Sequence, residues 1–593
     1  MSPRETAARL KNEMLERPDT RENAEPAEPV PAGEQQPEPA SPAPSSPSAP
    51  AASAPAAPPA FVPKPPLVML AYVLASLTAA VMQGLGTSLI SLNLQQLAGP
   101  LQATQTEASW LMAAYLFPNV SLGLILFKVR TQYGIRNFCE IAIIPYVLVC
   151  LAHLWVDDLG LDILLRFFAG AAAAPISSVA FLYMLEIFPP EKKLNVGLCM
   201  ALVGLALATP IAGLISPSLL DANDLSGLYL LELGLALITF GFIYVLPLSS
   251  PPRAKVISSM DILDYALLAV SMGCLAIVFT MGRLYWWFEA DWLAWLLIVA
   301  IVTATLLAMI ELNRKNNLVD FRWITSREIV HFAGVLLVFR ILLTEQSTGA
   351  INFLRQIGML NEQMTGLYWC ILIASVASGF ACAAVMKPGR EAAIHLVALI
   401  LLAIGSLMDS YSTALTRPEQ MYVSQSIIAF GSGLFLPPAM AVGFSAAIKK
   451  GMSYILSFFA VFLFTQKVGA FIGSALFGTF VTIREQYHSA IMASRLLSTD
   501  PLVAARLQQY VGAYAKSTPD GIQRTAQGAS LFARQVQTQA YVLAYNDAFF
   551  ATFLIAVGAI AVLLLDVAWS NRHRLLPRPV PALEMPSTIH SSN

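Results

Sequence analysis

The sequence predicts an all-α membrane protein with fourteen transmembrane helices. Of its 593 residues, 56% are hydrophobic and only 12% are charged, and the mean hydropathy is +0.63. Soluble globular domains carry about 25% charged residues. The length accommodates fourteen helices of about 20 residues, the length that crosses a hydrocarbon core of about 30 Å. Helices are expected because a backbone in lipid must satisfy its own hydrogen bonds.

Residues 1–65 are predicted to form a disordered Pro/Ala-rich tail. Between Pro3 and Pro66 the chain holds 17 of its 38 prolines, interleaved with Ala, Ser and Glu. Such a composition cannot bury enough apolar surface to fold. The tail also lacks the apolar core of a signal peptide, so we expect it to be cytoplasmic.

The rest of the chain contains the apolar segments that we interpret as the fourteen spans. Each is long enough to cross the hydrocarbon core as a helix. They lie near residues 66–90, 108–127, 137–156, 160–185, 195–219, 227–247, 263–282, 292–311, 328–350, 364–386, 392–411, 420–446, 453–482 and 545–568.

Basic residues in the short loops predict the orientation, because cytoplasmic loops carry an excess of Lys and Arg. With the N-terminus inside, the cytoplasmic loops hold fifteen Lys and Arg residues, whereas the opposite short loops hold only Arg283, Arg355 and Arg417. Adding or dropping one early helix would destroy this asymmetry. We therefore expect both termini to be cytoplasmic, with residues 569–593 as the C-terminal tail.

The long polar segment 484–544 is predicted to lie on the opposite side as a loop. Amphipathic stretches occur near residues 501–515 and 523–543, and Pro519-Asp520-Gly521 separates them. The segment is too polar to enter lipid. It is either a solvated loop or a docking element for a partner outside the membrane.

Composition excludes several other function classes. The net charge of -1 leaves no basic domain for a nucleic acid. The six cysteines lie singly in apolar runs without Cys-x-x-Cys spacing, so we expect no metal site. The six histidines are scattered without a visible acid–base constellation, and we expect neither an enzyme nor a cofactor.

A few ionisable residues lie within the predicted spans, where each costs a few kcal/mol to insert. Arg340 and Glu345 are about 140° apart on a helix, so each needs a partner on another element. Glu232 and Glu345 are the acids we expect to carry a proton. Structural pairing between helices is the alternative, and Asp409 lies in a span without an assigned role. The proton-coupling or pathway candidates are Arg166, Glu232, Arg340, Glu345 and Lys467.

Glycine and proline cluster in the fifth and twelfth predicted spans. Such residues permit close helix contact and kinking. In the fifth span, Gly204, Pro210 and Gly213 are the candidates for an interface that moves during function. Ordinary membrane-helix packing is the alternative, because both residue types are common in these helices.

Several motifs between Pro66 and Ser570 resemble the major facilitator superfamily, specifically its fourteen-span drug:proton antiporter branch. The resemblance implies two six-helix bundles, residues 66–247 and 328–568, with an extra hairpin at 248–327. It also implies a role in proton coupling for Arg166. The motifs are Leu165-Arg166-Phe167-Phe168-Ala169-Gly170, Leu207-Ala208-Thr209-Pro210-Ile211-Ala212-Gly213, Ser109-Trp110-Leu111, Gly282 with Trp287-Phe288, and Leu318-Val319-Asp320-Phe321-Arg322.

The end of the chain is similar to exporters that work with a periplasmic membrane-fusion adaptor and an outer-membrane channel. The similarity implies a cell inner membrane and an adaptor contact on the segment 484–544. It rests on Phe464-Thr465-Gln466, Gly469, Gly473 and Arg484-Glu485, followed by the long outer segment.

The chain departs from this branch at positions that matter for coupling. Gly86 stands where the first helix normally carries an Asp, and Gln466 stands where an Arg is expected. In this branch the loop between the second and third helices acts as a conformational latch and contains an acidic residue. Here Thr131 replaces that acidic residue, while Gly134 and Arg136 are kept. We therefore assign Gly134 and Arg136 to the conformational interface.

The predicted function is export of a small amphipathic or aromatic molecule by proton antiport, with membrane lipid as the surroundings. The pump would work alone or with the adaptor and channel. The alternative is a scaffold or sensor that kept the fold and lost coupling to protons. Gly86 and Thr131, which replace acids of the family pattern, leave this alternative open. A membrane-embedded transferase is a third hypothesis, but no residue in the sequence supports it.

Overall fold

The structure is a computed structural model in which most of the chain is described. The predicted tails fall outside the described residues, apart from residues 63–65 and 569–575. The described ranges are 63–156, 158–220, 226–249, 253–287, 289–314, 318–451, 454–497 and 499–575.

Every regular element in these ranges is helical. The helices that we call N-terminal are α2 (Pro66–Ala98), α3 (Gln105–Tyr133), α4 (Ile135–Ala152), α5 (Leu159–Glu186), α6 (Pro190–Lys192), α7 (Leu198–Ala206), α8 (Ala208–Leu219) and α9 (Ser226–Val245). The hairpin is α10 (Ser259–Met281) and α11 (Asp291–Asn313). The C-terminal helices are α12 (Phe321–Ile324), α13 (Arg327–Leu342), α14 (Ile351–Gln356), α15 (Thr365–Val385), α16 (Glu391–Asp409), α17 (Tyr422–Lys450), α18 (Tyr454–Arg495), α19 (Pro501–Ala513) and α20 (Gly521–Leu575).

The described part of the chain contains 13 helical segments that are long and apolar enough to cross a membrane. The predicted ninth span, 328–350, is helical too, but it is interrupted. There α13 ends at Leu342, Glu345–Ala350 forms a π-helical segment, and α14 continues to Gln356. The all-α membrane fold is thus confirmed, and one crossing is a broken helix that hydropathy alone does not distinguish from a straight one.

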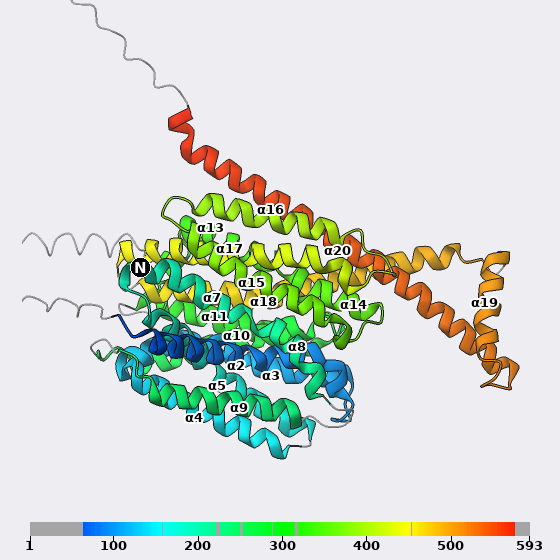
Figure 1. Cartoon of the computed structure of the whole chain (residues 1–593), viewed down its shortest axis with the longest axis horizontal. Helices are drawn as coiled ribbons and strands as arrows, with labels where there is room; N and C mark the ends of the chain where they lie inside the picture. The colour runs from blue at the N-terminus through cyan, green and yellow to red at the C-terminus, as the bar shows by residue number, and fades with distance from the viewer. Residues whose placement is uncertain are drawn as a thin grey trace, which may run out of the picture. The chain divides into compact units, whose positions relative to one another are not determined.

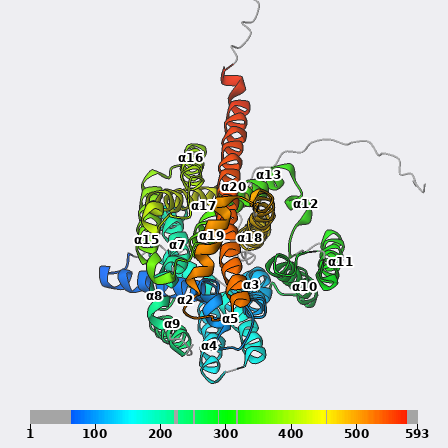
Figure 2. The ribbon, with the colours of Figure 1, turned by 90° about the vertical axis from the view of Figure 1, so that its right-hand side faces the viewer.

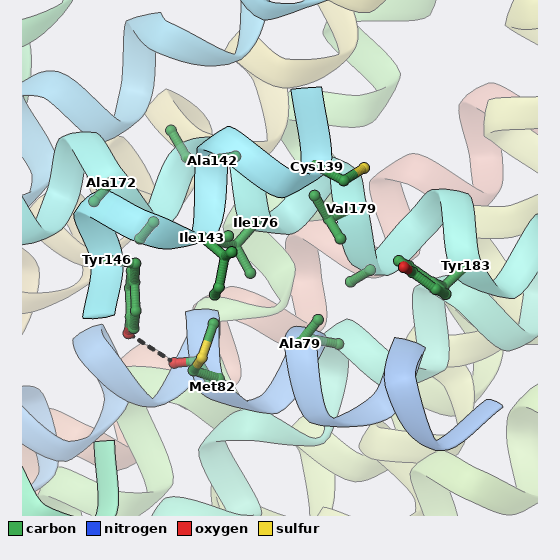
Figure 3. Packing of buried hydrophobic residues seen from close by; sticks show 14 of the residues in the cluster. Ala79, Met82, Cys139, Ala142, Ile143, Tyr146, Ala172, Ile176, Val179 and Tyr183 are labelled. Atoms are coloured by element: carbon green, nitrogen blue, oxygen red, sulfur yellow. Dashed lines mark hydrogen bonds between the residues drawn. The ribbon is translucent and has the colours of Figure 1, made fainter. Parts of the chain in front are cut away.

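Small and aromatic side chains bring α2, α4 and α5 together in the N-terminal core (Figure 3). Ala79 and Met82 of α2 face Ile143 of α4 and Ile176 of α5, and all four side chains are fully buried. The Tyr146 hydroxyl donates a hydrogen bond to the Met82 carbonyl at 3.4 Å. Such contacts fix the position of α5, which carries Arg166.

The α10–α11 hairpin packs at the edge of the molecule against α3 and α18 (Figure 2). An ion-pair cluster holds its ends. Arg314 bonds to Asp261 at 2.9 Å and also to Asp264, while Lys128 of α3 lies 3.0 Å from Asp261. Both aspartates are fully buried, so these ion pairs join the hairpin to α3.

The segment predicted as a loop at 484–544 is instead largely helical. α18 continues past its predicted end at 482 to Arg495, α19 follows, and α20 begins at Gly521 (Figure 1). The Asp500 side chain caps α19, and the Arg484 guanidinium bonds to Asp547 of α20 at 2.7 Å. The amphipathic stretches form helices because they pack against each other: a Cβ on Gly528 would lie 2.6 Å from Val511.

We predict that Gly213→Ala destabilises this arrangement by about 1–3 kcal/mol, the usual cost of overpacking. A Cβ at Gly213 of α8 would lie 2.4 Å from the buried Tyr368 ring of α15. Gly234→Ala is the matched control, because its Cβ would meet nothing within 4 Å. Thermal unfolding of the two variants in detergent checks this, and equal midpoints would contradict it.

Candidate functional site

A cavity of about 790 Å³ lies between the N-terminal and C-terminal helices. Apolar groups form most of its walls, among them Leu202, Phe339, Phe459 and Phe462. A smaller cavity of about 410 Å³ shares Gln83, Arg340, Gln466 and Lys467 with the larger one. Both cavities are lined by residues from each half of the chain, so a molecule inside would contact both halves.

Arg166 forms the centre of a buried charge cluster among the N-terminal helices. Its Nη1 lies 3.6 Å from Glu232 Oε1 of α9 and donates a hydrogen bond of 3.4 Å to the Gly86 carbonyl of α2. Asp162, four residues earlier on the same face of α5, lies 4.0 Å from Arg166 Nε. The exposed fraction is 1% for Arg166 and Asp162 and 4% for Glu232.

Two further polar groups complete this cluster. The Tyr229 hydroxyl donates a hydrogen bond to Asp162 Oδ2 at 3.0 Å. His153 Nε2 lies 3.5 Å from Asp162 Oδ1, and its Nδ1 contacts the Val149 carbonyl at 2.8 Å. Asp162 was not predicted as a site residue, although its spacing of four from Arg166 is a signal that could have identified it.

Gly86, where an acid was expected, lies beside Tyr115 and Arg166. A Cβ there would lie 3.0 Å from the Tyr115 hydroxyl, so a larger side chain at this position would require Tyr115 to shift. Arg166 bonds instead to the Gly86 backbone and lies beside Glu232. The carboxylates next to this arginine therefore come from α5 and α9 rather than from α2.

A second buried cluster brings two carboxyl groups together among the C-terminal helices. Gln425 of α17 donates hydrogen bonds from Nε2 to Glu345 Oε1 at 3.1 Å and to Asp409 Oδ2 at 2.7 Å. Ser424 donates to Asp409 Oδ1 at 2.5 Å. Glu345 is fully buried and begins the π-helical segment, while its Oε2 has no hydrogen-bond partner among the described residues.

Arg340 and Lys467 lie apart from both acid clusters and line the two cavities. Lys467 Nζ of α18 donates hydrogen bonds to the Asn119 carbonyl at 2.7 Å and to Asn119 Oδ1 at 2.6 Å. Arg340 packs beside Gly469, whose Cβ would lie 3.3 Å from Arg340 Cγ. As expected from their spacing, Arg340 and Glu345 do not pair with each other in the described structure.

The conformational candidates of the fifth span occupy two different places. Gly213 faces Tyr368 across the boundary between the halves, and Pro210 lines the larger cavity. Gly204 faces α2 instead, where its Cβ would lie 3.7 Å from Ala80. The structure thus brings Pro210 and Gly213, but not Gly204, to the boundary between the two halves.

The latch candidates lie where α3 ends. Gly134 has φ +86°, a left-handed backbone that favours glycine, and a Cβ there would lie 3.0 Å from Arg253 Nε. Thr131 accepts a hydrogen bond at its carbonyl from the Ala254 amide at 3.3 Å. Arg136 is exposed and pairs with Glu140 at 2.8 Å. The contacts of Gly134 and Thr131 join the end of α3 to the linker before α10, whereas the Arg136–Glu140 pair lies within α4.

The described residues contain no group of three or more His, Cys, Asp or Glu side chains that could hold a metal ion. All six cysteines are free thiols.

Comparisons with known proteins give two curated relatives, and no family model matches the chain. The multidrug export protein EmrB of Haemophilus influenzae is 22% identical over 85% of this chain and 96% of its own length. The fatty acid resistance protein FarB of Neisseria gonorrhoeae is 24% identical over 44% of this chain and 52% of its own length. Among solved structures, human MFSD10 aligns with a TM-score of 0.49 and 11% identity, covering 83% of this chain and all 100% of its own. The proton:xylose symporter XylE aligns with a TM-score of 0.43 and 12% identity over 81% of this chain and 94% of its own.

Proposed function

We propose that this chain, a drug-efflux transporter of the major facilitator superfamily, exports small amphipathic or aromatic compounds by proton antiport with alternating access. EmrB and FarB, which are named for multidrug export and fatty acid resistance, support export of compounds of this kind.

The observation that carries the proposal is the cavity between the two halves. Its volume of about 790 Å³ is within the range of pockets that hold drug-sized ligands, about 300–1,000 Å³. Alternating access requires a site whose walls come from both halves, so that rocking exposes it first to one side and then to the other. Pro210 lines this cavity and Gly213 contacts Tyr368 at the same boundary, which supports a moving interface there.

The buried acids supply the proton sites in this proposal. Glu232 with Arg166 takes the place of the acid absent at Gly86, and Glu345 with Asp409 forms the second site. Ionisable groups inside a membrane protein commonly serve proton transfer or substrate pathways. Both acid clusters lie outside the cavity lining. Protonation of these acids would therefore change the helix packing within each half. Arg340 and Lys467, which line the cavities, act in the substrate pathway.

The proposed setting is a cell inner membrane with both termini cytoplasmic. The excess of basic residues in alternate loops supports this orientation. We assign residues 66–247 and 328–568 to the two bundles and 248–327 to the hairpin. The α18–α19–α20 projection lies at the end of the bundle opposite the start of α2 (Figure 1), which suits a contact with a periplasmic adaptor and an outer-membrane channel.

The alternative, a scaffold or sensor without coupling, is favoured by the absent acid at Gly86 and by Thr131 in the latch. Two observations weigh against it. Arg166 has a carboxylate partner in Glu232, and the cavity remains open between the halves. The cavity in particular fits a transporter better than a scaffold.

We expect inside-out membrane vesicles that contain the protein to accumulate an amphipathic compound when their lumen is acidified. A protonophore should return the level to that of vesicles without the protein, because collapse of the gradient removes the driving force. The compounds tested include acidic, neutral and basic dyes of similar size. Lack of gradient-dependent accumulation for every compound would refute proton antiport.

A further inference from the structure

The cavities have a one-sided charge distribution. The charged residues of the larger cavity's described lining are Arg130, Lys193, Arg340 and Lys467, and no Asp or Glu is among them. In the smaller cavity they are Arg283, Arg340 and Lys467, again without an acid among the described lining residues. The space inside is therefore electropositive.

The buried acids of the two clusters already interact with residues other than the cavity cations. Asp162 and Glu232 surround Arg166, while Glu345 and Asp409 share Gln425. None of these four carboxylates belongs to the described lining of either cavity. The cavity cations consequently lack carboxylate partners from these clusters.

Arg340 differs from the paired arginines of this structure. Arg166 and Arg314 each lie within 4.0 Å of at least two carboxylates. Arg340 has no ion pair among the described residues, and its buried Nε has no hydrogen-bond partner there. A guanidinium carries five N–H donors in a planar fork that matches a carboxylate or sulfonate. Arg340 lines both cavities, so its guanidinium is available to a molecule inside them.

Lys467 adds a second positive charge at the place where the two cavities meet. Its hydrogen bonds go to the Asn119 carbonyl and to Asn119 Oδ1, and both acceptors are uncharged. An ammonium has three donors, so a third remains for an occupant. Because Asn119 belongs to α3 and Lys467 to α18, an anion bound here would contact both halves of the chain.

The walls around these cations are apolar. Phe339, Phe459, Phe462 and Leu202 line the larger cavity, and such surfaces accept a hydrocarbon chain or an aromatic ring. We propose that the cavity selects amphipathic anions, with a carboxylate or sulfonate at Arg340 and Lys467 and the apolar part along these walls. This inference rests on the proposed function, since it names the substrate class of the same site.

The test is binding of dansyl-undecanoic acid to purified full-length protein in nanodiscs of uncharged lipid at pH 8. The uncharged primary amide and the primary amine of the same chain are compared with the acid. We expect the wild-type protein to bind the acid about tenfold more tightly than the amide, since hydrogen bonds to ionised groups are roughly twice as strong as neutral ones. The amine should bind most weakly, because the cations repel it.

Variants assign the preference to the proposed residue. Arg340→Gln should bind the acid and the amide alike, whereas Arg340→Lys should retain part of the preference. Arg390→Gln, at an exposed arginine before α16, is the matched control and should behave as wild type. A single size-exclusion peak for each variant shows that it is folded, and Arg340→Lys still tests the proposal if Arg340→Gln does not fold.

The outcomes separate this inference from the proposed function. Equal binding of acid, amide and amine by the wild type, or an unchanged preference in folded Arg340→Gln, would overturn anion selection. In vesicles, gradient-driven accumulation of neutral and basic dyes to the same level as acidic ones would overturn it as well. Anion-selective binding without any gradient-driven accumulation would instead refute antiport and leave anion selection supported.

Discussion

Glu345→Gln is expected to reduce gradient-driven accumulation at least about tenfold, because transport depends on proton transfer. Gln425 bonds to Glu345 Oε1, and an amide retains an oxygen at that place, so the helix packing should persist. The amide cannot take up or release a proton. Accumulation in vesicles, compared with wild type in the presence of a protonophore, measures the effect.

Counterflow separates coupling from substrate binding in this variant. Exchange of labelled for unlabelled substrate requires alternating access but no net proton movement, so Glu345→Gln should still catalyse it. Asp409→Asn should show the same pattern, because Gln425 bonds to both acids. Glu419→Gln, at an exposed glutamate, is the control. Undiminished accumulation in Glu345→Gln, Asp409→Asn and their double variant would remove this pair from the mechanism.

The sequence was sufficient to predict the helical membrane fold because hydropathy reports directly on the length and polarity of each segment. It did not predict the break in the ninth span. The residues from Arg327 to Gln356 are apolar enough to read as one helix, whereas the π-helical segment at Glu345–Ala350 depends on packing against other helices. Such segments occur frequently at functional sites.

The structure of segment 484–544 was not predicted for a different reason. Its amphipathic stretches were recognised, but a polar composition favours a loop when each stretch is considered alone. The helices are stabilised by contacts between residues far apart in the chain, such as Arg484 with Asp547 and Gly528 with Val511. Hydropathy contains no information on these pairings.

The candidate site was predicted residue by residue, whereas its pairings came from the structure. Arg166 and Glu232 were both selected, but their 3.6 Å contact joins helices 66 residues apart and has no local signal. The sequence placed Asp409 in a span but indicated no role for it. Only the structure shows that Asp409 and Glu345 both accept hydrogen bonds from the Gln425 amide. Gln425 was missed since a neutral amide in an apolar helix does not stand out.

Arg166→Gln is expected to destabilise the protein by about 3–5 kcal/mol, the usual result of removing one partner from a buried charge cluster. Asp162 and Glu232, both buried, would lose the cation between them. Thermal unfolding followed with a thiol-reactive fluorophore suits this measurement, because five of the six free cysteines are buried and react only after unfolding. Arg390→Gln, at an exposed arginine, provides the control.

The double variant Arg166→Gln/Glu232→Gln should be more stable than Arg166→Gln alone, because it removes one of the two uncompensated carboxylates. Glu232→Gln by itself should cost less than Arg166→Gln, since Arg166 keeps Asp162 at 4.0 Å and the Gly86 carbonyl at 3.4 Å. The difference between the double variant and the sum of the single variants gives the coupling energy of the pair. Strict additivity would mean that Arg166 and Glu232 do not interact, and the substitution of Glu232 for the acid absent at Gly86 would then have no energetic support.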